Sequence, residues 1–532
     1  MRFKFLHLFF VSLFSLAFVS SCDFGFQFSG SVIKKEKAVA PRCCTAKLVL
    51  KNANDLFTNE FSFKEIDNSI KILNGTFLGN SQRNYYGDSI GTDLDIIWKT
   101  SIGKGQTICV HDSVETWMGA GWTGQPLMVE ENGIPFLIQG CYDHHLKKVN
   151  AVSGELVWEY LFDDIIKGTG TLYVNKTAQE KEEQLVVMQG SRIGFKLKSW
   201  QKEIFSFRAV SYFSGKENWR MNVKRGASYS RDVDASALVL HDTAYIGLEN
   251  GIFTVFDPRK QNAEMVRDSF RPKILQELDL FNKEDKKLHG GELVTESSPC
   301  RIGDHLYITS GSGHVYGYNL TTKKIDWDFY TASDLDGSPV VTNDKCLIIT
   351  IEKQFIKGRG GAMKIDPSKP ADNNCVVWYF PTGDKKFSDW KGGIIGTAAV
   401  SKSFTTNKNK PQHQLCAFMA IDGYFYVVDQ NEIEKDSLVY GPDSVAQFPK
   451  PKFIYRQKIG ASIATPLIVG NRIVATGYAG LRIFEFDTQF NFKEIASFKG
   501  FFESTPFVNK GRVYIASRNG FLYCFGKKEE VL

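Results

Sequence analysis

Residues 297–330 read SSPCRIGDHLYITSGSGHVYGYNLTTKKIDWDFY. Within this stretch, polar and apolar residues alternate on both sides of the turn residues Gly311–Gly313, and the last run carries Trp327. Alternation with a period of two, interrupted by Gly, Asn and Asp, predicts an antiparallel meander of four strands. Its length suits one blade of a β-propeller, which has about 40 residues. The expected strands lie at residues 298–302, 305–310, 314–319 and 325–330.

The same unit returns along the chain at constant spacing. Prolines lie 40 residues apart in two pairs, Pro299 with Pro339 and Pro466 with Pro506. A tryptophan also lies 8 residues after the end of a predicted strand in three repeats, at Trp158, Trp219 and Trp327. Trp98 and Trp378 hold the corresponding strand in two further repeats. Self-similarity at a period of about 20–50 residues is the sequence signature of a repeat architecture.

Eight such units can be counted. They lie near residues 122–160, 168–223, 234–278, 296–331, 336–380, 393–459, 461–498, and 502–525 together with 94–101. The last unit has three strands at the C-terminal end and lacks a fourth, and residues 94–101 supply a lone strand. Pairing the two removes exposed sheet edges. We therefore predict an all-β, eight-bladed propeller of four-stranded antiparallel blades, closed by an N-terminal strand. Polar insertions at 176–184, 196–204, 402–414 and 432–452 are expected to be surface loops.

The first 21 residues have the pattern of an export signal. A basic start is followed by an apolar run from Phe5 to Phe18, which is too short for a comfortable membrane span. Val19–Cys22 resembles the lipobox of bacterial lipoproteins, and the resemblance implies cleavage and lipidation at Cys22. The alternative is an ordinary signal peptide with an incidental cysteine. The expected organisation is a signal peptide at 1–21, an anchor, tether and lead-in at 22–93, and the propeller at 94–527.

Composition and charge exclude several classes of function. The chain of 532 residues has a net charge of +6 and no long run of Lys or Arg, so we expect no nucleic-acid partner. The cysteines show no zinc-type spacing and no disulfide framework. Asp143, His144 and His145 are adjacent, but neighbouring side chains on a strand point to opposite faces, so we expect no metal site there. We expect a monomer without a catalytic set.

The repeat has a specific resemblance. An apolar strand ends in Asp or Asn, Thr/Ser-Gly follows, and then tryptophan, as in VNAVSGELVW at residues 149–158. This pattern resembles the repeat of PQQ-type propellers, the domains of quinoprotein dehydrogenases and of their non-enzymatic relatives. The resemblance implies that the tryptophans Trp98, Trp158, Trp219, Trp327 and Trp378 pack between blades. A lipidated propeller without further domains most resembles the BamB-type outer-membrane assembly factors, which bind other proteins.

One constellation of charged residues is predicted from the repeat alignment. The position three residues before the proline holds Asp234, Glu296, Asp336 and Glu503 in four blades. Equivalent positions lie around the propeller axis, so these carboxylates are expected to face one funnel, near Arg231, Asp232, Lys391, Trp122 and Gln125. A ring of like charges needs cations, a metal or raised pKa values. The ring is either a cation- or ligand-binding mouth or a set of bonds to neighbouring backbone, and the second interpretation is favoured.

Two functions from different classes follow from the resemblance. The preferred one is a lipoprotein anchored in the bacterial cell envelope, at the outer membrane, whose rim loops hold a protein partner. The rival is a periplasmic PQQ-dependent dehydrogenase with calcium. That rival requires adjacent cysteines within the propeller, whereas Cys43-Cys44 precedes it, and Trp117, Trp122 or Trp390 would have to stack on the quinone. No residue-by-residue ligand set is found, so we expect no cofactor.

Overall fold

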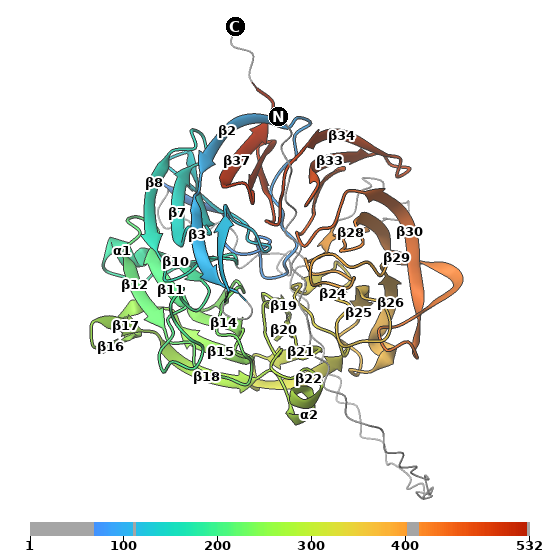
Figure 1. The fold of residues 1–532 in the computed structure, drawn as a ribbon, viewed down its shortest axis with the longest axis horizontal. Coiled ribbons are helices and arrows are strands. Elements are labelled where there is room, and N and C mark those ends of the chain that lie inside the picture. The colour runs from blue at the N-terminus through green and yellow to red at the C-terminus, as the bar shows by residue number, and fades with distance from the viewer. Residues whose placement is uncertain (1–68, 110–112, 402–413, 529–532) are drawn as a thin grey trace, which may run out of the picture. The chain divides into compact units, whose positions relative to one another are not determined.

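A computed structural model describes residues 69–109, 113–401 and 414–528, all within one compact unit at Thr58–Leu532. The expected signal peptide, Cys22, Cys43-Cys44 and most of the expected tether lie outside the described residues. Eight sheets with four or five strands follow one another around a central axis in chain order (Figure 1). The eight-bladed, all-β architecture expected from the repeats is confirmed. None of the described helices is both long and apolar enough to cross a membrane.

Each blade is an antiparallel meander that begins at the axis and runs outward. The first four blades contain β5 (Leu127–Glu131), β6 (Ile134–Gly140), β7 (His145–Asn150) and β8 (Leu156–Leu161); β9 (Thr171–Val174), β10 (Leu185–Gly190), β11 (Phe207–Ser211) and β12 (Glu217–Met221); β13 (Leu238–Leu240), β14 (Thr243–Leu248), β15 (Ile252–Asp257) and β18 (Lys273–Asp279); and β19 (Cys300–Ile302), β20 (His305–Thr309), β21 (His314–Asn319) and β22 (Lys324–Tyr330).

The next four blades repeat the same order. They contain β23 (Val340–Val341), β24 (Leu347–Ile351), β25 (Gly361–Ile365) and β26 (Val376–Pro381); β27 (Ala399–Val400), β28 (Leu415–Met419), β29 (Tyr424–Tyr440) and β30 (Gln447–Lys458); β31 (Leu467–Val469), β32 (Arg472–Gly477), β33 (Gly480–Phe486) and β34 (Phe492–Phe498); and β35 (Phe507–Asn509), β36 (Arg512–Ala516), β37 (Phe521–Gly526) and β2 (Asp95–Ser101). In this last blade β2 pairs antiparallel with β37, and Trp98 lies opposite Cys524. That pairing is the one predicted for the lone strand at residues 94–101.

Short elements decorate the blades. Two-stranded hairpins are formed by β3 (Lys104–Ile108) with β4 (Val114–Met118) and by β16 (Glu264–Val266) with β17 (Ser269–Arg271). Helix α1 (Lys181–Gln184) ends the polar insertion of the second blade, and α2 (Lys283–Leu288) precedes the fourth blade. Asn282 caps α2 with its side chain, which accepts hydrogen bonds from the backbone N–H groups of Glu284 and Asp285.

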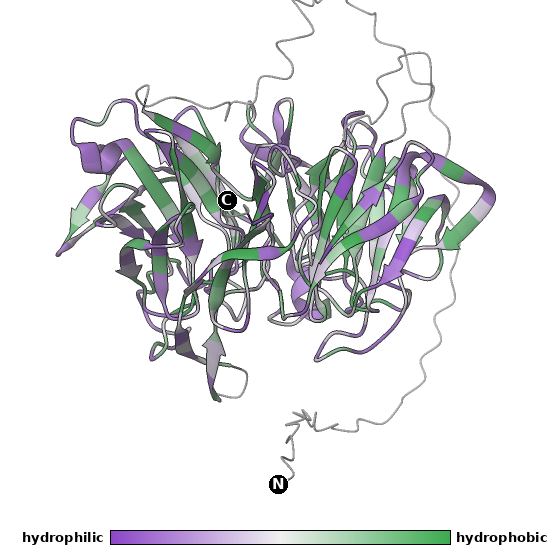
Figure 2. Ribbon diagram, turned by 90° about the horizontal axis from the view of Figure 1, so that it is seen from above, coloured by the Kyte–Doolittle hydropathy of each residue, from purple (hydrophilic) through white to green (hydrophobic). Residues whose placement is uncertain are grey.

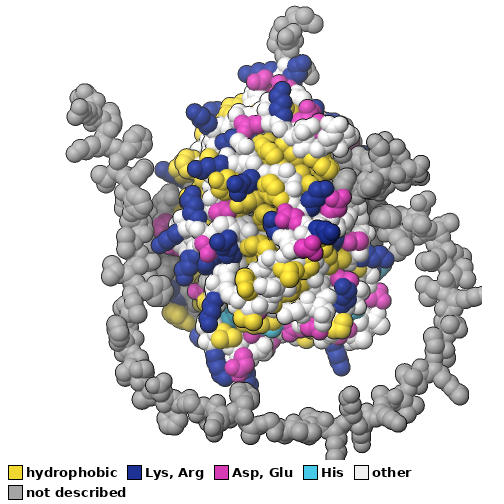
Figure 3. All heavy atoms as spheres, turned by 90° about the vertical axis from the view of Figure 1, so that its right-hand side faces the viewer, with side chains coloured by type: hydrophobic (Ala, Val, Ile, Leu, Met, Phe, Trp, Pro, Cys, Tyr) yellow, Lys and Arg dark blue, Asp and Glu magenta, His cyan; other side chains and the backbone are white. Residues whose placement is uncertain are grey.

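The insertion at residues 432–452 is a β-hairpin, and the expectation of a surface loop is wrong. Strands β29 and β30 continue through most of it, with Val439 opposite Phe448. Phe448 is buried against the fifth blade, whereas Leu438 and Tyr440 are 60% and 61% exposed. The polar composition was misleading because only one face of the hairpin packs. Hydrophobic side chains are visible on this side of the molecule (Figure 3).

Buried hydrophobic residues of neighbouring blades form shared clusters. Figure 2 shows hydrophobic segments alternating with hydrophilic ones along the strands. The repeat tryptophans join each blade to the next through their indole N–H groups. These donate to backbone oxygens in five pairs: Trp98 to Ala151, Trp158 to Tyr212, Trp219 to Pro258, Trp327 to Lys369, and Trp378 to Gln430, at 2.8–3.0 Å.

The Ser-Gly of the repeat pattern has a physical reason. Gly154 has a φ of +79°, and a Cβ added there would lie 2.8 Å from the ring of Trp98. A glycine is therefore required both for the turn and for the close approach of the preceding blade.

The stretch at residues 70–93 closes one end of the axis, and sequence reasoning did not foresee how it is ordered. Strand β1 (Ile70–Asn74) adds to the inner edge of the first blade, opposite β5. The following residues then contact the innermost strands of blades around the ring. Arg83 is fully buried and donates hydrogen bonds to the backbone oxygens of Phe77, Ser236 and Pro299. We call residues 70–93 the plug.

Candidate functional site

The innermost strands present equivalent positions to the axis. One such position lies three residues before the repeat proline, or before the residue that replaces it. From the first blade to the eighth, it holds Thr123, Lys167, Asp234, Glu296, Asp336, Ile395, Ile463 and Glu503. Two residues further along, hydroxyl side chains link the blades. The backbone N–H of Ser298 donates to Ser338 Oγ at 2.8 Å, and that of Ser338 to Thr397 Oγ1 at 2.9 Å. This ring of hydroxyls holds the axial side chains in register.

Two adjoining hollows lie on the axis. The inner one reaches Phe77 of the plug, and the outer one, of about 180 Å³, lies on the opposite side. Trp122, Glu296 and Asp336 line both. The fourth blade shows that the outer hollow and the plug lie at opposite ends of the axis. Glu292, before β19, lines the outer hollow, whereas Arg301, within β19, donates its backbone N–H to Ser81 in the plug. We call the outer end the mouth.

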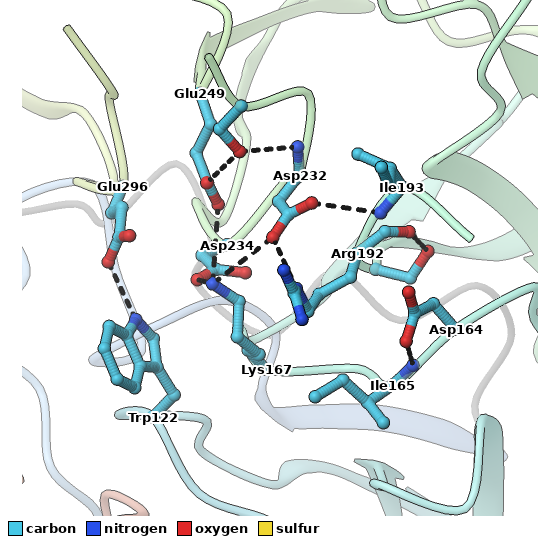
Figure 4. Close-up of polar contacts among 12 residues, drawn as sticks. Trp122, Asp164, Ile165, Lys167, Arg192, Ile193, Asp232, Asp234, Glu249 and Glu296 are labelled. Carbon is cyan, nitrogen blue, oxygen red and sulfur yellow. Dashed lines mark hydrogen bonds and ion pairs between the residues drawn. The ribbon is translucent and has the colours of Figure 1, made fainter. Parts of the chain in front are cut away.

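Lys167 is the cation that sequence reasoning missed. Its Nζ lies 2.7 Å from Asp234, 3.6 Å from Asp232 and 3.8 Å from Glu249 (Figure 4). Burial works to lower the lysine pKa, but these carboxylates outweigh it and hold the pKa well above its usual value. Lys167 occupies in the second blade the position that Asp234 occupies in the third. The repeat alignment could have identified Lys167, but in the second blade a glycine replaces the proline that marks this position in other blades.

The positive charge of Lys167 only partly compensates the carboxyl groups of Asp234 and Glu249. Burial raises the pKa of Asp234 to about 7 against the opposing effect of Lys167, and it raises the pKa of Glu249 well above the usual range. Asp234 Oδ1 has no hydrogen-bond partner among the described residues. One carboxylate oxygen from each of Asp234, Glu249 and Glu296 could be shared by a cation, since all three lie within 4.8 Å of one another.

A second acidic group lines the mouth beside the first. The side chains of Asp334 and Asp336 share a hydrogen bond, and Glu352 lies next to them. Burial and the neighbouring carboxylates raise the pKa of all three groups well above the usual range. Glu292 also lines the mouth and accepts a hydrogen bond from Gln354. Blades three to five therefore form an acidic wall.

The opposite wall is apolar. Ile395, Ile421 and Ile463 form one buried cluster, and Trp122 and Trp390 pack against it. The centroids of the two indole rings lie 5.9 Å apart. Trp122 Nε1 donates to Glu296 Oε2 at 2.8 Å, so Trp122 joins the two walls (Figure 4). The result is a hollow with carboxylates on one side and aliphatic and aromatic groups on the other.

The backbone is strained where these walls meet. Trp122 and Thr123 have φ values of 51° and 64°, and neither is a glycine. Such conformations cost about 1–3 kcal/mol each and gather at functional sites. The Trp122 ring lines both hollows, and Lys167 Nζ lies 5.0 Å from its centroid.

Three of the four carboxylates expected to share a funnel line the inner hollow, namely Asp234, Glu296 and Asp336. Glu503 does not line either hollow. It pairs with Arg518 at 2.9 Å and accepts a hydrogen bond from Tyr478, so its charge is already matched. Glu503 therefore bonds neighbouring side chains and not the backbone of the adjacent blade, whereas the acidic wall lines open space.

The other residues expected near the funnel also divide into those that line a hollow and those that bond neighbouring groups. Trp122 lines both hollows, and Asp232 pairs with Arg192 at 2.9 Å. Arg231 is buried and donates to the backbone oxygens of the second blade, so it serves packing. Gln125 is buried and accepts from the backbone N–H of Leu78 in the plug. Lys391 is exposed.

The remaining sequence candidates lie apart from this site. His144 bonds the backbone oxygen of Gln106, and His145 bonds that of Asp143, so the two histidines face different partners. Each cysteine within the described ranges is free. Trp117 stacks edge-on against Tyr142 and does not line either hollow.

No protein-family model and no curated protein sequence matches the chain. Solved structures do resemble it. A quinohemoprotein alcohol dehydrogenase from Comamonas testosteroni aligns with a TM-score of 0.50 at 13% identity, over 87% of this chain and 82% of that one. BamB from Moraxella catarrhalis aligns at 0.45 and 12% identity, over 82% of this chain and 99% of that one. A europium-containing methanol dehydrogenase aligns at 0.48 and 11%, over 89% and 100%. These likenesses concern the fold of a PQQ-like propeller.

The lining of the mouth fits cations better than it fits PQQ. A quinone that carries several carboxylates needs positive partners, and none of the residues that line the outer hollow is a lysine or an arginine. Lys167, the nearest buried cation, is already engaged by three carboxylates. PQQ therefore does not fit this lining unless a metal ion such as calcium first neutralises the acidic wall.

Proposed function

We propose that this protein is a non-catalytic binding module of the bacterial cell envelope, anchored through a lipid at Cys22, that holds a protein partner at the mouth of its propeller. The observation that carries the proposal is a group of exposed apolar side chains around the acidic mouth. Tyr229 lines the outer hollow and is 65% exposed, and Phe355, beside the lining residue Gln354, is 45% exposed. Leu288, at the end of α2, is 61% exposed.

Tyr229 and Phe355 both adjoin the segment that follows α2, in which Leu288 is the last helical residue. The backbone N–H of Tyr229 donates to Gly291, just beyond α2, and His289 stacks on Phe355 with ring centroids 4.5 Å apart. Contiguous exposed apolar groups rimmed by charge are typical of protein-binding surfaces. The exposed face of the β29–β30 hairpin, with Leu438 and Tyr440, adds a second surface of this kind on the side of the molecule.

The rival function is a PQQ-dependent dehydrogenase that uses calcium and oxidises alcohols or sugars. Its support is the fold likeness, which is shared by enzymes and binding proteins. The acidic wall offers oxygen ligands for calcium, but the mouth offers no cationic side chain for the quinone. We therefore place this function second.

Site-specific photo-cross-linking in the producing cells tests the proposal. A photoreactive residue at Phe355 should give an adduct with a protein, whereas the same residue at Thr322 should not. Thr322 is exposed in the neighbouring fourth blade, in the turn between β21 and β22 at the end away from the mouth, which makes it a matched control. Absence of an adduct from Phe355, Tyr229 and Leu288 alike would contradict a partner at the mouth. Cys22→Ala should release the protein from the membrane fraction.

A further inference from the structure

The mouth gathers five carboxyl groups, and a basic residue whose charge acts on it from outside the lining is Lys391, which favours the charged forms of Glu292 and Glu352. The outer hollow is lined by the carboxyl groups of Glu292, Glu296, Asp334, Asp336 and Glu352 and by no basic residue. Lys167 lies beside Asp234, with its Nζ atom 2.7 Å from the Asp234 carboxylate. Burying like charges together is costly, so a site of this composition favours an external cation.

A second observation points to a ligand. Asp334 is only 7% exposed, lines the outer hollow, and has an Oδ1 atom without a hydrogen-bond partner among the described residues. Buried carboxylate oxygens are paired in most proteins, so an unpaired one on a residue that lines a hollow marks a place for a donor. The strained backbone at Trp122 and Thr123 supports the same location.

The apolar wall decides between kinds of cation. A divalent metal ion prefers oxygen ligands on all sides, whereas here the rings of Trp122 and Trp390 also line the outer hollow, and they pack against the isoleucine cluster of Ile395 and Ile463 beneath it. An organic cation uses both walls, because its charged end pairs with carboxylates and its carbon chain packs on aromatic and aliphatic surface. Indole rings attract ammonium groups in addition.

We propose that the mouth is a binding site for an organic ammonium ion, whose charged group contacts Asp334, Asp336 and Glu296 and whose carbon chain packs against Trp122 and Trp390. This inference rests on the proposed binding function and names the chemistry that the site recognises. The ammonium group belongs either to a lysine side chain of the protein partner or to a free amine, and both sources share this chemistry.

The test uses the full-length protein in detergent and follows tryptophan fluorescence and binding heat. The probes are benzylammonium, its neutral isostere benzyl alcohol, calcium chloride, and a peptide with lysine or norleucine between two apolar residues. We expect saturable binding of benzylammonium or the lysine peptide, and no saturable binding of benzyl alcohol or the norleucine peptide. Binding by the lysine peptide alone assigns the site to a protein side chain, and binding by both assigns it to amines in general.

Variants locate the binding. Asp336→Asn and Asp334→Asn should each weaken ammonium binding by about tenfold or more, because each removes a charged partner of the cation. Glu277→Gln, in the outer strand β18, is the control and should leave the affinity unchanged. The ammonium should also raise the thermal unfolding temperature of the unaltered protein, a measurement that does not depend on the variants.

Three results would overturn the inference: equal binding of benzyl alcohol and benzylammonium, no binding of any ammonium probe, or binding of calcium alone. These results differ from failure of the proposed function. Cross-links at Phe355 without ammonium binding would leave a partner but refute this chemistry, whereas ammonium binding without cross-links would leave an amine receptor and contradict the scaffold.

Discussion

The indole N–H of Trp378 donates a hydrogen bond of 2.8 Å to the backbone oxygen of Gln430, which belongs to the next blade. Trp378 has no exposed surface, whereas Trp327, at the equivalent place one blade earlier, is only partly buried. The resemblance led us to expect all five tryptophans between blades. They all bond the following blade, but they are buried to different degrees.

Trp378→Ala is therefore expected to reduce the free energy of unfolding by about 3–5 kcal/mol, because it leaves a cavity and removes one of the two hydrogen bonds to the Gln430 backbone oxygen, the other coming from Lys364. Trp327→Ala should cost clearly less, since water already reaches this side chain. Denaturant unfolding of both variants beside the unaltered protein measures the difference. An equal loss of unfolding free energy in the two variants would show that the degree of burial of each tryptophan does not determine its contribution to stability.

Lys167→Met is expected to destabilise the propeller by about 3–5 kcal/mol near neutral pH, because it leaves Asp232, Asp234 and Glu249 without their shared cation. The loss should shrink in acid, where these carboxyl groups take up protons. Thermal unfolding across pH measures both effects. A loss that does not change with pH would mean that Lys167 acts through packing alone.

The raised pKa of Asp234 makes the stability depend on pH. An acid with a folded pKa of about 7 and a usual value of 3.8 binds its proton more tightly in the folded state. Its contribution is therefore fully present below 3.8 and is lost as the pH rises to about 7. Asp234→Asn should flatten the fall in unfolding free energy across this range. A profile as steep as that of the unaltered protein would place the titration elsewhere.

Ring closure by β2 predicts a sharp difference between two truncations. A chain that starts at residue 69 keeps β1, the plug and β2, and should remain monomeric. A chain that starts at residue 103 exposes the edge of β37 and should aggregate, because unpaired strand edges recruit other chains. Size-exclusion chromatography compares them. A stable monomer from the shorter chain would contradict closure as a requirement for solubility.

Much of this fold was predictable from the sequence because each repeat carries its own strand alternation, turn and tryptophan. The plug was not, since its partners lie in other blades and it has no periodic pattern; Arg83, for example, bonds Ser236 and Pro299. Within the site, the alignment found Asp234, Glu296 and Asp336. It missed Lys167, whose repeat lacks the proline, and it misplaced Glu503, because its partner Arg518 comes from the turn between β36 and β37 of the same blade.

The most direct measurement on the central claim is a titration of the protein lacking residues 1–22 with PQQ and calcium. Tryptophan fluorescence reports binding, and reduction of an electron-accepting dye with alcohols or sugars reports turnover. A binding module with a cation-selective mouth should show no dye reduction at any PQQ concentration. Saturable PQQ binding accompanied by substrate-dependent dye reduction would contradict it and would make the acidic wall part of a quinoprotein active site.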